Sequence, residues 1–189
     1  LEGLKMKYKL KTLGDHNFKN SLAAQKVATL FGVPGKVSRE IIESFPGLEH
    51  RIEFVRELRG VKYFNNSKAT NIASAIAGMD SFSRPKIVLI GGHDKNLNLV
   101  PLVRRLLSWD IKLAVFYGET ARKLSQISKD IGFSRLNNVK GLKDALSYAH
   151  KFSEGGDIIL LSPGTSSFDE FENYEERGKK FKAWVKKLK

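Results

Sequence analysis

The sequence predicts an α/β fold in which a doubly wound, mainly parallel sheet follows a strand and helices that belong to another domain. From residue 48 onward, short apolar runs alternate with amphipathic helical segments. Short connections between such elements imply right-handed crossovers within one sheet. The last run, residues 158–161, lies between Gly155-Gly156 and Pro163-Gly164 and is apolar throughout, as expected for a strand buried on both faces.

The first 47 residues have a different pattern. In residues 5–13 apolar side chains alternate with lysines, which predicts a strand with one wet face. Residues 16–31 carry apolar side chains on one helical face and end at Gly32 and Pro34. A second short helix, residues 37–45, ends at Pro46-Gly47. We therefore expect a domain boundary there, with residues 1–47 in one domain and residues 48–189 in the next.

The second domain begins with a hairpin. Its strands, residues 51–58 and 61–64, flank Arg59-Gly60. The elements expected after it are helix 72–82, strand 86–90, helix 99–107, strand 112–117, helix 119–131, a weak strand at 135–139 and helix 142–152.

A helix is predicted directly after the strand at residues 158–161. Ser167 with Glu170 three residues on is a capping-box signature, and Phe168, Phe171, Tyr174 and Phe181 follow at helical spacing. A helix N-terminus with nearby hydroxyls at the carboxyl end of a sheet suits an anionic ligand. The alternative is an ordinary capped turn from strand to helix.

Three loops are expected at the same, carboxyl edge of the sheet, namely residues 65–71, 91–96 and 162–167. Two of them carry a lysine, Lys68 and Lys95, and hydroxyls come from Thr70, Ser166 and Ser167. Together they suit a ligand with several carboxylates or phosphates. Basic loops at a sheet edge also occur for solubility alone.

Composition narrows the function classes. The chain has 33 basic and 20 acidic residues, a net charge of +13 and no cysteine, so nucleic acid, acidic membrane surfaces and phosphorylated metabolites are all conceivable partners. No apolar run approaches the length of a membrane span. The chain starts at Leu1, and we expect it to be a fragment of a cytoplasmic protein. It contains neither a G-x-G-x-x-G motif nor a Walker loop, and no set of metal ligands.

Five segments resemble consecutive motifs of the Mur ligases. Their order and spacing extend along nearly the whole chain, and they are GDHNFKNSLAA (14–24), HRIEF (50–54), NNSKATN (65–71), GGHDKN (91–96) and LLSPGTSSFDEFENYEERG (160–178). Within this family the SKATN loop is similar to that of the members that add D-glutamate to UDP-N-acetylmuramoyl-L-alanine. Ligases for other amino acids carry different residues there.

The resemblance implies ATP-dependent synthesis of an amide bond in peptidoglycan biosynthesis, through an acyl phosphate and supported by Mg2+. It also implies that residues 1–47 end a central ATP-binding domain and that the rest is a Rossmann-like C-terminal domain, which closes over the site. The phosphate loop and the magnesium ligands would precede this chain. We therefore expect a monomeric enzyme that binds no nucleic acid, and no turnover by this chain alone.

The same resemblance implies roles for individual residues. Lys68 and Arg51 would be catalytic. ATP would be held by Asn17, Asn20, Arg51 and Asn66, and D-glutamate by Thr70, Lys95, Ser167, Phe168 and Tyr174. The family usually has aspartate where Asn66 stands, and asparagine lacks its charge. Capping of the first helix is the alternative role of Asn17 and Asn20. The alternatives for the whole chain are a ligase for another amino acid or a non-catalytic, basic nucleotide- or nucleic-acid-binding module.

Overall fold

The structure, a computed structural model, describes residues 8–189. Internal packing divides the chain into two compact units, Leu1–Glu49 and His50–Lys189, and each is described by itself. Among residues 8–189 there is no helix whose length and apolar character would let it cross a membrane.

Two helices dominate the described part of the first unit, α2 (Asp15–Leu30) and α3 (Gly35–Ser44), and they pack against each other. The ring of Tyr8 meets the buried ring of Phe18 edge-on, with 6.1 Å between the ring centroids. Large apolar side chains of this unit remain exposed, among them Val27, Leu30, Phe31 and Ile41.

The strand predicted for residues 5–13 is wrong over the part that can be judged. Residues 5–7 lie outside the described residues, and residues 8–13 form no strand. The Tyr8 hydroxyl hydrogen-bonds Gln25 of α2, and the backbone N–H of Lys9 donates to Glu43 of α3 over 3.1 Å. A strand needs a neighbouring strand to complete its hydrogen bonds. Here side chains of α2 and α3 accept the hydrogen bonds of Tyr8 and Lys9 instead.

The second unit contains a six-stranded sheet in the order β1-β2-β6-β3-β4-β5. Only β1 is antiparallel to its neighbour, and the other pairs are parallel. The predicted doubly wound, mainly parallel sheet is confirmed. The strands are β1 (Glu53–Leu58), β2 (Val61–Asn65), β3 (Lys86–Gly91), β4 (Ile111–Tyr117), β5 (Leu136–Asn138) and β6 (Ile158–Gly164).

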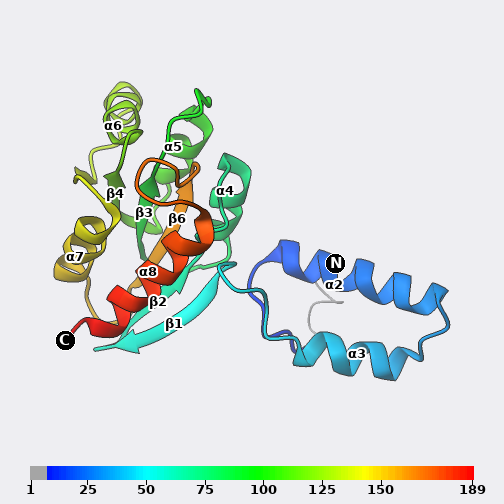
Figure 1. Ribbon diagram of the computed structural model, residues 1–189. Coiled ribbons are helices and arrows are strands. Elements are labelled where there is room, and N and C mark those ends of the chain that lie inside the picture. The colour runs from blue at the N-terminus through cyan, green and yellow to red at the C-terminus, as the bar shows by residue number, and fades with distance from the viewer. Residues whose placement is uncertain (1–7) are drawn as a thin grey trace. The chain divides into compact units, whose positions relative to one another are not determined.

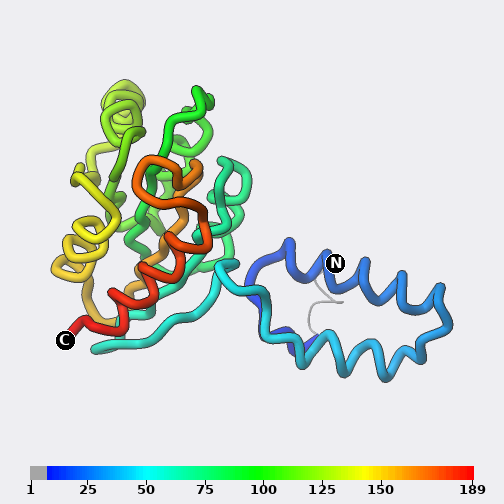
Figure 2. The backbone as a smooth tube through the Cα atoms, in the orientation of Figure 1, coloured from blue at the N-terminus to red at the C-terminus, as the bar shows by residue number. Residues whose placement is uncertain are grey.

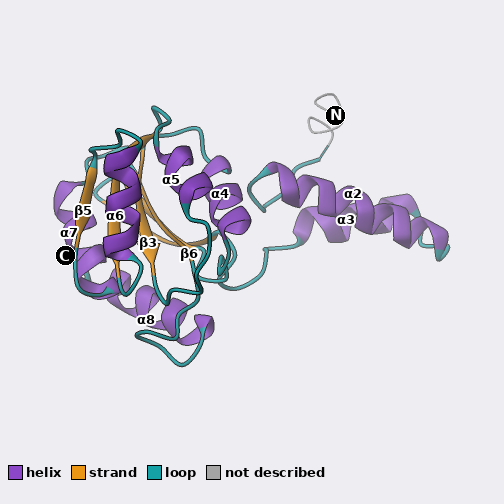
Figure 3. Ribbon diagram, turned by 90° about the horizontal axis from the view of Figure 1, so that it is seen from above, coloured by secondary structure: helices purple, strands orange, loops and turns teal. Residues whose placement is uncertain are grey.

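Helices cover both faces of the sheet (Figures 1 and 3). One face packs against α4 (Ile72–Asp80), α5 (Val100–Leu106) and α6 (Ala121–Asp130) through one apolar cluster. The other face packs against α7 (Leu142–Phe152) and α8 (Tyr174–Lys187) through a second cluster. Because both faces are covered, every residue of β3 and β6 is buried, which explains their continuous apolar runs.

The hairpin turn is formed as predicted. Arg59 and Gly60 have φ angles of 52° and 79°, and positive φ at both central residues is characteristic of the two-residue turns that match the twist of a hairpin.

A buried ion cluster lies at the amino end of β3. The Lys86 ammonium is fully buried, donates to the Phe82 carbonyl over 2.9 Å and pairs with the Asp110 carboxylate over 2.5 Å. Arg105 donates to both oxygens of the same carboxylate, over 2.9 and 2.8 Å. Burial by itself raises the pKa of Asp110, but the hydrogen bonds from Arg105 and Lys86 together outweigh burial and hold this pKa well below its usual range.

Removing this carboxylate is expected to destabilise the second unit. Asp110→Asn leaves the Lys86 ammonium buried without its counter-charge, so the free energy of unfolding at pH 7 should fall by about 3 kcal/mol. The exposed Asp130→Asn is the matched control and should stay within about 0.5 kcal/mol of the unchanged chain. Urea unfolding at pH 7 measures both, and equal stability of the two variants would contradict the account.

The loss should also depend on pH. A folded-state pKa below the unfolded value contributes stability above the unfolded pKa, and this contribution disappears as the pH falls through the folded pKa. The difference between the unchanged chain and Asp110→Asn should therefore be full above about pH 5 and shrink below about pH 4.

Candidate active-site loops

Three loops follow neighbouring strands at the carboxyl edge of the sheet. We call them the β2 loop (residues 66–71), the β3 loop (residues 92–96) and the β6 loop (residues 165–173). The backbone N–H of Gly164 donates to the Ala69 carbonyl over 2.9 Å, and that of His93 donates to the Ser166 carbonyl over 3.0 Å. Hydrogen bonds thus tie the β6 loop, and the end of its strand, to the loops on either side.

The β3 and β6 loops are also tied to the end of β4. The Thr120 hydroxyl and backbone N–H both donate to the Gly92 carbonyl, each over 3.1 Å. The backbone N–H of Glu119 donates to the Asp169 carboxylate over 3.2 Å. Figure 2 shows the β6 loop as an orange segment that turns back on itself before it enters α8. The expectation that these loops meet is therefore confirmed by direct contacts.

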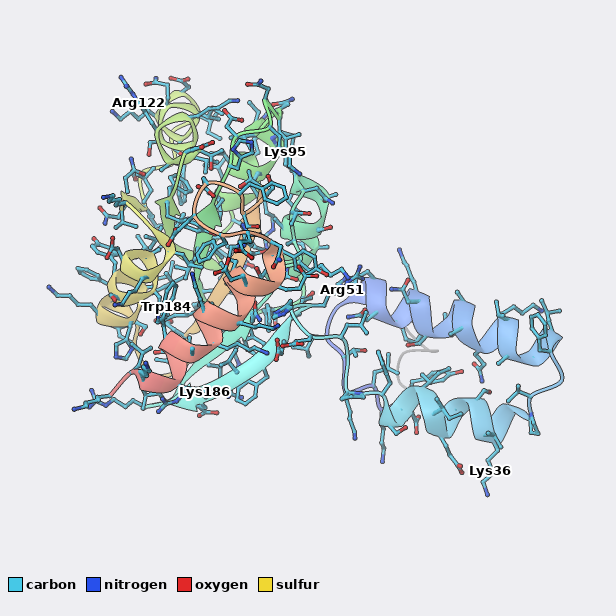
Figure 4. The ribbon with its side chains drawn as sticks, in the orientation of Figure 1. Lys36, Arg51, Lys95, Arg122, Trp184 and Lys186 are labelled. Carbon is cyan, nitrogen blue, oxygen red and sulfur yellow. The ribbon has the colours of Figure 1, made fainter. Side chains whose placement is uncertain are left out.

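Lys68 and Lys95 keep their ammonium groups available. The Lys68 ammonium lies 5.4 Å from the centroid of the Tyr174 ring, which holds it by a cation–π contact. Lys95 is exposed on the β3 loop (Figure 4). Within residues 8–189 neither lysine forms an ion pair. Two unneutralised cations at one sheet edge favour an anionic ligand.

The other residues expected at the amino-acid site lie on the same loops. Thr70 is half-buried and ends a tight turn, in which its N–H donates to the Lys68 carbonyl over 2.8 Å. Ser167 is 2% exposed, whereas Phe168 beside it is 65% exposed. Tyr174 begins α8, and its carbonyl accepts a hydrogen bond from the Ser67 hydroxyl over 2.8 Å.

The helix start predicted at Ser167 is wrong, because α8 begins at Tyr174. Its N-cap is Asn173, whose side chain accepts from the Glu176 N–H over 2.8 Å. Glu170 does not form a capping box with Ser167. Its carboxylate instead accepts from the N–H of Leu142, the first residue of α7, over 3.0 Å. Glu170 thus satisfies a free donor of another helix, and residues 165–173 remain a loop.

Asn66, which is expected to contact ATP, makes its side-chain hydrogen bonds within the chain. It is 5% exposed, and its amide donates to the Ser162 hydroxyl over 3.1 Å. Its side-chain oxygen accepts from the Ile52 N–H over 3.4 Å. The amide nitrogen lies only 2.3 Å from the position that a Cβ on Gly78 would occupy. The side chain therefore packs between β6 and α4, where it supports the start of the β2 loop.

The residues expected to contact ATP lie on both units. Arg51 is exposed at the start of the second unit (Figure 4). Asn17 and Asn20 lie in the first two turns of α2, and Asn20 is exposed. The Asn17 amide donates to the Leu13 carbonyl over 2.7 Å. Part of its hydrogen-bonding capacity therefore supports the start of the helix.

Sequence reasoning missed Arg177, which is fully buried beneath the β2 and β6 loops. Its guanidinium hydrogen-bonds Ser67 on one loop and Thr165 and Ser166 on the other. One signal could have revealed it. Arg177 occupies the same helical stripe as Phe181, Trp184 and Val185, so the helical period places it on the face of α8 that packs on the sheet.

A cavity of about 450 Å³ opens at the same edge between the β6 loop and the start of α7. Its charged lining comes from Glu119, Lys140, Lys143, Asp144, Asp169 and Glu170. Burial raises the pKa of Glu170, and the neighbouring carboxylates of Asp169 and Asp144 raise it further. None of the residues expected to hold an anion lines this acidic cavity, so it is distinct from the surface that carries Lys68 and Lys95.

Close contact between the β3 and β6 loops predicts that Gly92 accepts no side chain. Its φ is +131°, and an added Cβ would lie 2.2 Å from the Ser166 carbonyl oxygen. Gly156 is the matched control, with φ of +100° and nothing within 4 Å of such a Cβ. Gly92→Ala should lower the free energy of unfolding by about 2 kcal/mol more than Gly156→Ala in a denaturant titration. Equal losses would mean that the contact between the loops is loose.

Comparison with known proteins agrees with this architecture. A family model described as "Mur ligase, glutamate ligase domain" matches residues 50–165. Among solved structures, the UDP-N-acetylmuramate-alanine ligase of Thermotoga maritima has a TM-score of 0.70 at 16% identity, over 95% of this chain and 40% of that one. A pseudomurein peptide ligase type C from Methanothermus fervidus has a TM-score of 0.72 at 16% identity, over 96% and 38%. At this identity the two structures show a shared fold.

Curated relatives are more similar in sequence. The UDP-N-acetylmuramoylalanine–D-glutamate ligase of Clostridioides difficile is 40% identical over 176 residues, which are 93% of this chain and 39% of the relative. That of Latilactobacillus sakei is 39% identical over 165 residues, 87% of this chain and 36% of the relative. The chain therefore spans less than two fifths of these relatives' length. By the match over residues 50–165, the chain belongs to the Mur ligase family.

Proposed function

We propose that this chain is the C-terminal part of an ATP-dependent ligase that joins D-glutamate to UDP-N-acetylmuramoyl-L-alanine in peptidoglycan biosynthesis. The observation that carries the proposal is the meeting of the β2, β3 and β6 loops at one sheet edge, with two lysines that make no ion pair among the described residues. The relatives named as D-glutamate ligases support the choice of amino acid. Residues 1–47 would end the central ATP-binding domain, and residues 48–189 would form the C-terminal domain.

The proposed chemistry has two steps. A carboxylate oxygen of UDP-N-acetylmuramoyl-L-alanine attacks the γ-phosphorus of ATP, and the bond to ADP breaks to leave an acyl phosphate. The amine nitrogen of D-glutamate then attacks the acyl carbon, loses a proton and expels inorganic phosphate from the tetrahedral intermediate. Negative charge develops on phosphoryl oxygens and then on an oxyanion, and fixed cations stabilise both.

In this proposal Lys68 faces the transferring phosphate. Its ammonium is held against the Tyr174 ring and forms no ion pair among the described residues, so it fits a phosphoryl group. Lys95 and Ser167 take the carboxylates of D-glutamate, and Thr70, Phe168 and Tyr174 complete that site. The Phe168 ring, which is exposed, would cover the bound amino acid.

The proposal also assigns contacts with ATP. Arg51 would reach its phosphates, and Asn17 and Asn20 would meet its adenine side or phosphates. We assign Asn66 the support of the β2 loop in place of a direct contact with ATP, because both ends of its side-chain amide are bonded within the chain. Magnesium, which neutralises phosphate charge in such reactions, would be held by residues that precede this chain. By itself the chain should therefore release no phosphate from ATP, and we propose a monomeric, cytoplasmic enzyme.

Phosphate release from ATP tests the proposal. The polypeptide extended to its natural N-terminus should release phosphate only when both UDP-N-acetylmuramoyl-L-alanine and D-glutamate are present. Release that follows another amino acid would keep the family chemistry and overturn the specificity. No phosphate release with any acceptor, together with oligonucleotide binding that weakens steeply with salt, would favour a basic nucleic-acid-binding module.

The role of Lys95 predicts a selective effect on the amino acid. In the complete enzyme Lys95→Ala should raise the KM for D-glutamate roughly 10- to 100-fold, because a charge-assisted hydrogen bond is lost. The KM for ATP should change little. Arg122→Ala removes an exposed cation on α6 and is the control (Figure 4). If both variants gave the KM of the unchanged enzyme for D-glutamate, the assignment of Lys95 would be withdrawn.

A further inference from the structure

Arg177 is the largest side chain that is fully buried in the described residues, and it lies between two of the loops. Its Nε donates to the Ser67 hydroxyl over 2.9 Å, and Nη2 donates to the Ser67 carbonyl over 2.8 Å. On the other side, Nη1 donates to the carbonyls of Thr165 and Ser166 over 3.3 and 3.2 Å. One guanidinium therefore spans the β2 loop, which carries Lys68, and the β6 loop, which carries Ser167.

We infer that Arg177 is a positioning residue that holds the β2 and β6 loops in the geometry the ligand requires and directs the backbone N–H of Ser167 toward that ligand. This inference rests on the proposed function for the identity of the ligand. The link between the loops depends on the contacts alone.

The planar, five-donor head of arginine is essential to this link. The acceptors on Ser67 and those on Thr165 and Ser166 belong to different loops, and a rigid fork reaches both sets at once. A lysine ammonium is a compact charge on a flexible stem and has three donors. It would keep the charge but satisfy fewer of these acceptors.

Arg177 also sets the direction of two peptide dipoles. The carbonyls of Thr165 and Ser166 both accept from Nη1. In a trans peptide unit the C=O and N–H bonds point in opposite directions, so the N–H groups of Ser166 and Ser167 are turned away from the guanidinium. The Ser167 N–H donates to no acceptor within residues 8–189. Ser166 is paired with His93 in an antiparallel bridge, so of the two N–H groups that of Ser167 remains for an anion.

The guanidinium of Arg177 contacts no carboxylate directly in the described part of the chain. Within residues 8–189 it forms no ion pair. The titratable groups that act on it are Tyr117, Asp169 and Glu170. Burial raises the pKa of Tyr117, so this phenol stays neutral at physiological pH. Burial also lowers the pKa of Arg177, which an arginine tolerates without losing its proton. The carboxylates of Asp169 and Glu170 act on the guanidinium from nearby without forming an ion pair with it.

Amide hydrogen exchange on the complete polypeptide without substrates tests the link independently of activity. In Arg177→Lys, amides of residues 66–71 and 165–171 should exchange about tenfold faster, since at least one charge-assisted hydrogen bond is lost. Amides of β3 and β4 should be unchanged. Arg56→Lys is the matched control, because Nη1 of Arg56 donates to carbonyls of Val185, Lys186 and Leu188 at the far end of α8. In Arg56→Lys the amide exchange rates of both loops should be unchanged.

Ser67→Ala provides a second variant with a small, uncharged change. It removes the acceptor of Arg177 Nε and the hydrogen bond to the Tyr174 carbonyl, so exchange should accelerate about threefold in both loops. If Arg177→Lys does not fold, this variant decides the question alone. Unchanged exchange in both loops of a folded variant would overturn the inference.

Kinetics of the complete enzyme then test the positioning role. Arg177→Lys should raise the KM for D-glutamate about tenfold and lower kcat, and Arg56→Lys should change neither. Faster loop exchange with unchanged kinetics would show that the link does not serve the site, and would overturn the positioning role. The complete polypeptide without substitutions could also join no amino acid while Arg177→Lys still speeds exchange in both loops. This result would overturn the proposed function and support the link between the loops.

Discussion

The central strand β6 is the constraint on which the rest of the second unit depends. It pairs in parallel with β2 on one side and β3 on the other, and all of its residues are buried. Parallel pairing brings the carboxyl ends of the three strands to one edge. The β6 loop must then emerge between the β2 and β3 loops, and Gly164 and Ser166 bond to both. The site follows from the order of the strands.

Among the described residues, buried positive charge has a carboxylate partner at one end of the sheet and none in direct contact at the other. At the amino end, the Lys86 ammonium meets the Asp110 carboxylate, and Arg105 completes a neutralised cluster. At the carboxyl end, Arg177 meets only carbonyls and a hydroxyl. In the first arrangement the buried charges balance one another, and removing one partner would leave an uncompensated buried charge. The second leaves the guanidinium without a contacting carboxylate in residues 8–189, near the edge where Lys68 and Lys95 lie and where an anionic amino acid and phosphate are proposed to bind.

Local patterns predicted most of the second unit because local and global preferences agree there. The apolar run at residues 158–161 and the Arg59-Gly60 turn each allow one structure. Where the prediction failed, contacts with residues distant in sequence determined the structure. Glu170 caps α7 in preference to the following helix, and Asn66 bonds Ser162, a residue that is remote in sequence. The contacts of Arg177 could not be predicted either, because its partners lie on two separate loops.

The central claim is that the carboxyl-edge loops of this Mur ligase domain bind the amino-acid substrate. A crystal structure of the complete polypeptide with ADP, UDP-N-acetylmuramoyl-L-alanine and D-glutamate tests it most directly. The account predicts the D-glutamate carboxylates within hydrogen-bond distance of the Lys95 ammonium and of the Ser167 hydroxyl or N–H. D-glutamate bound in the acidic cavity beside Asp144 and Glu170, or away from the β3 and β6 loops, would contradict it.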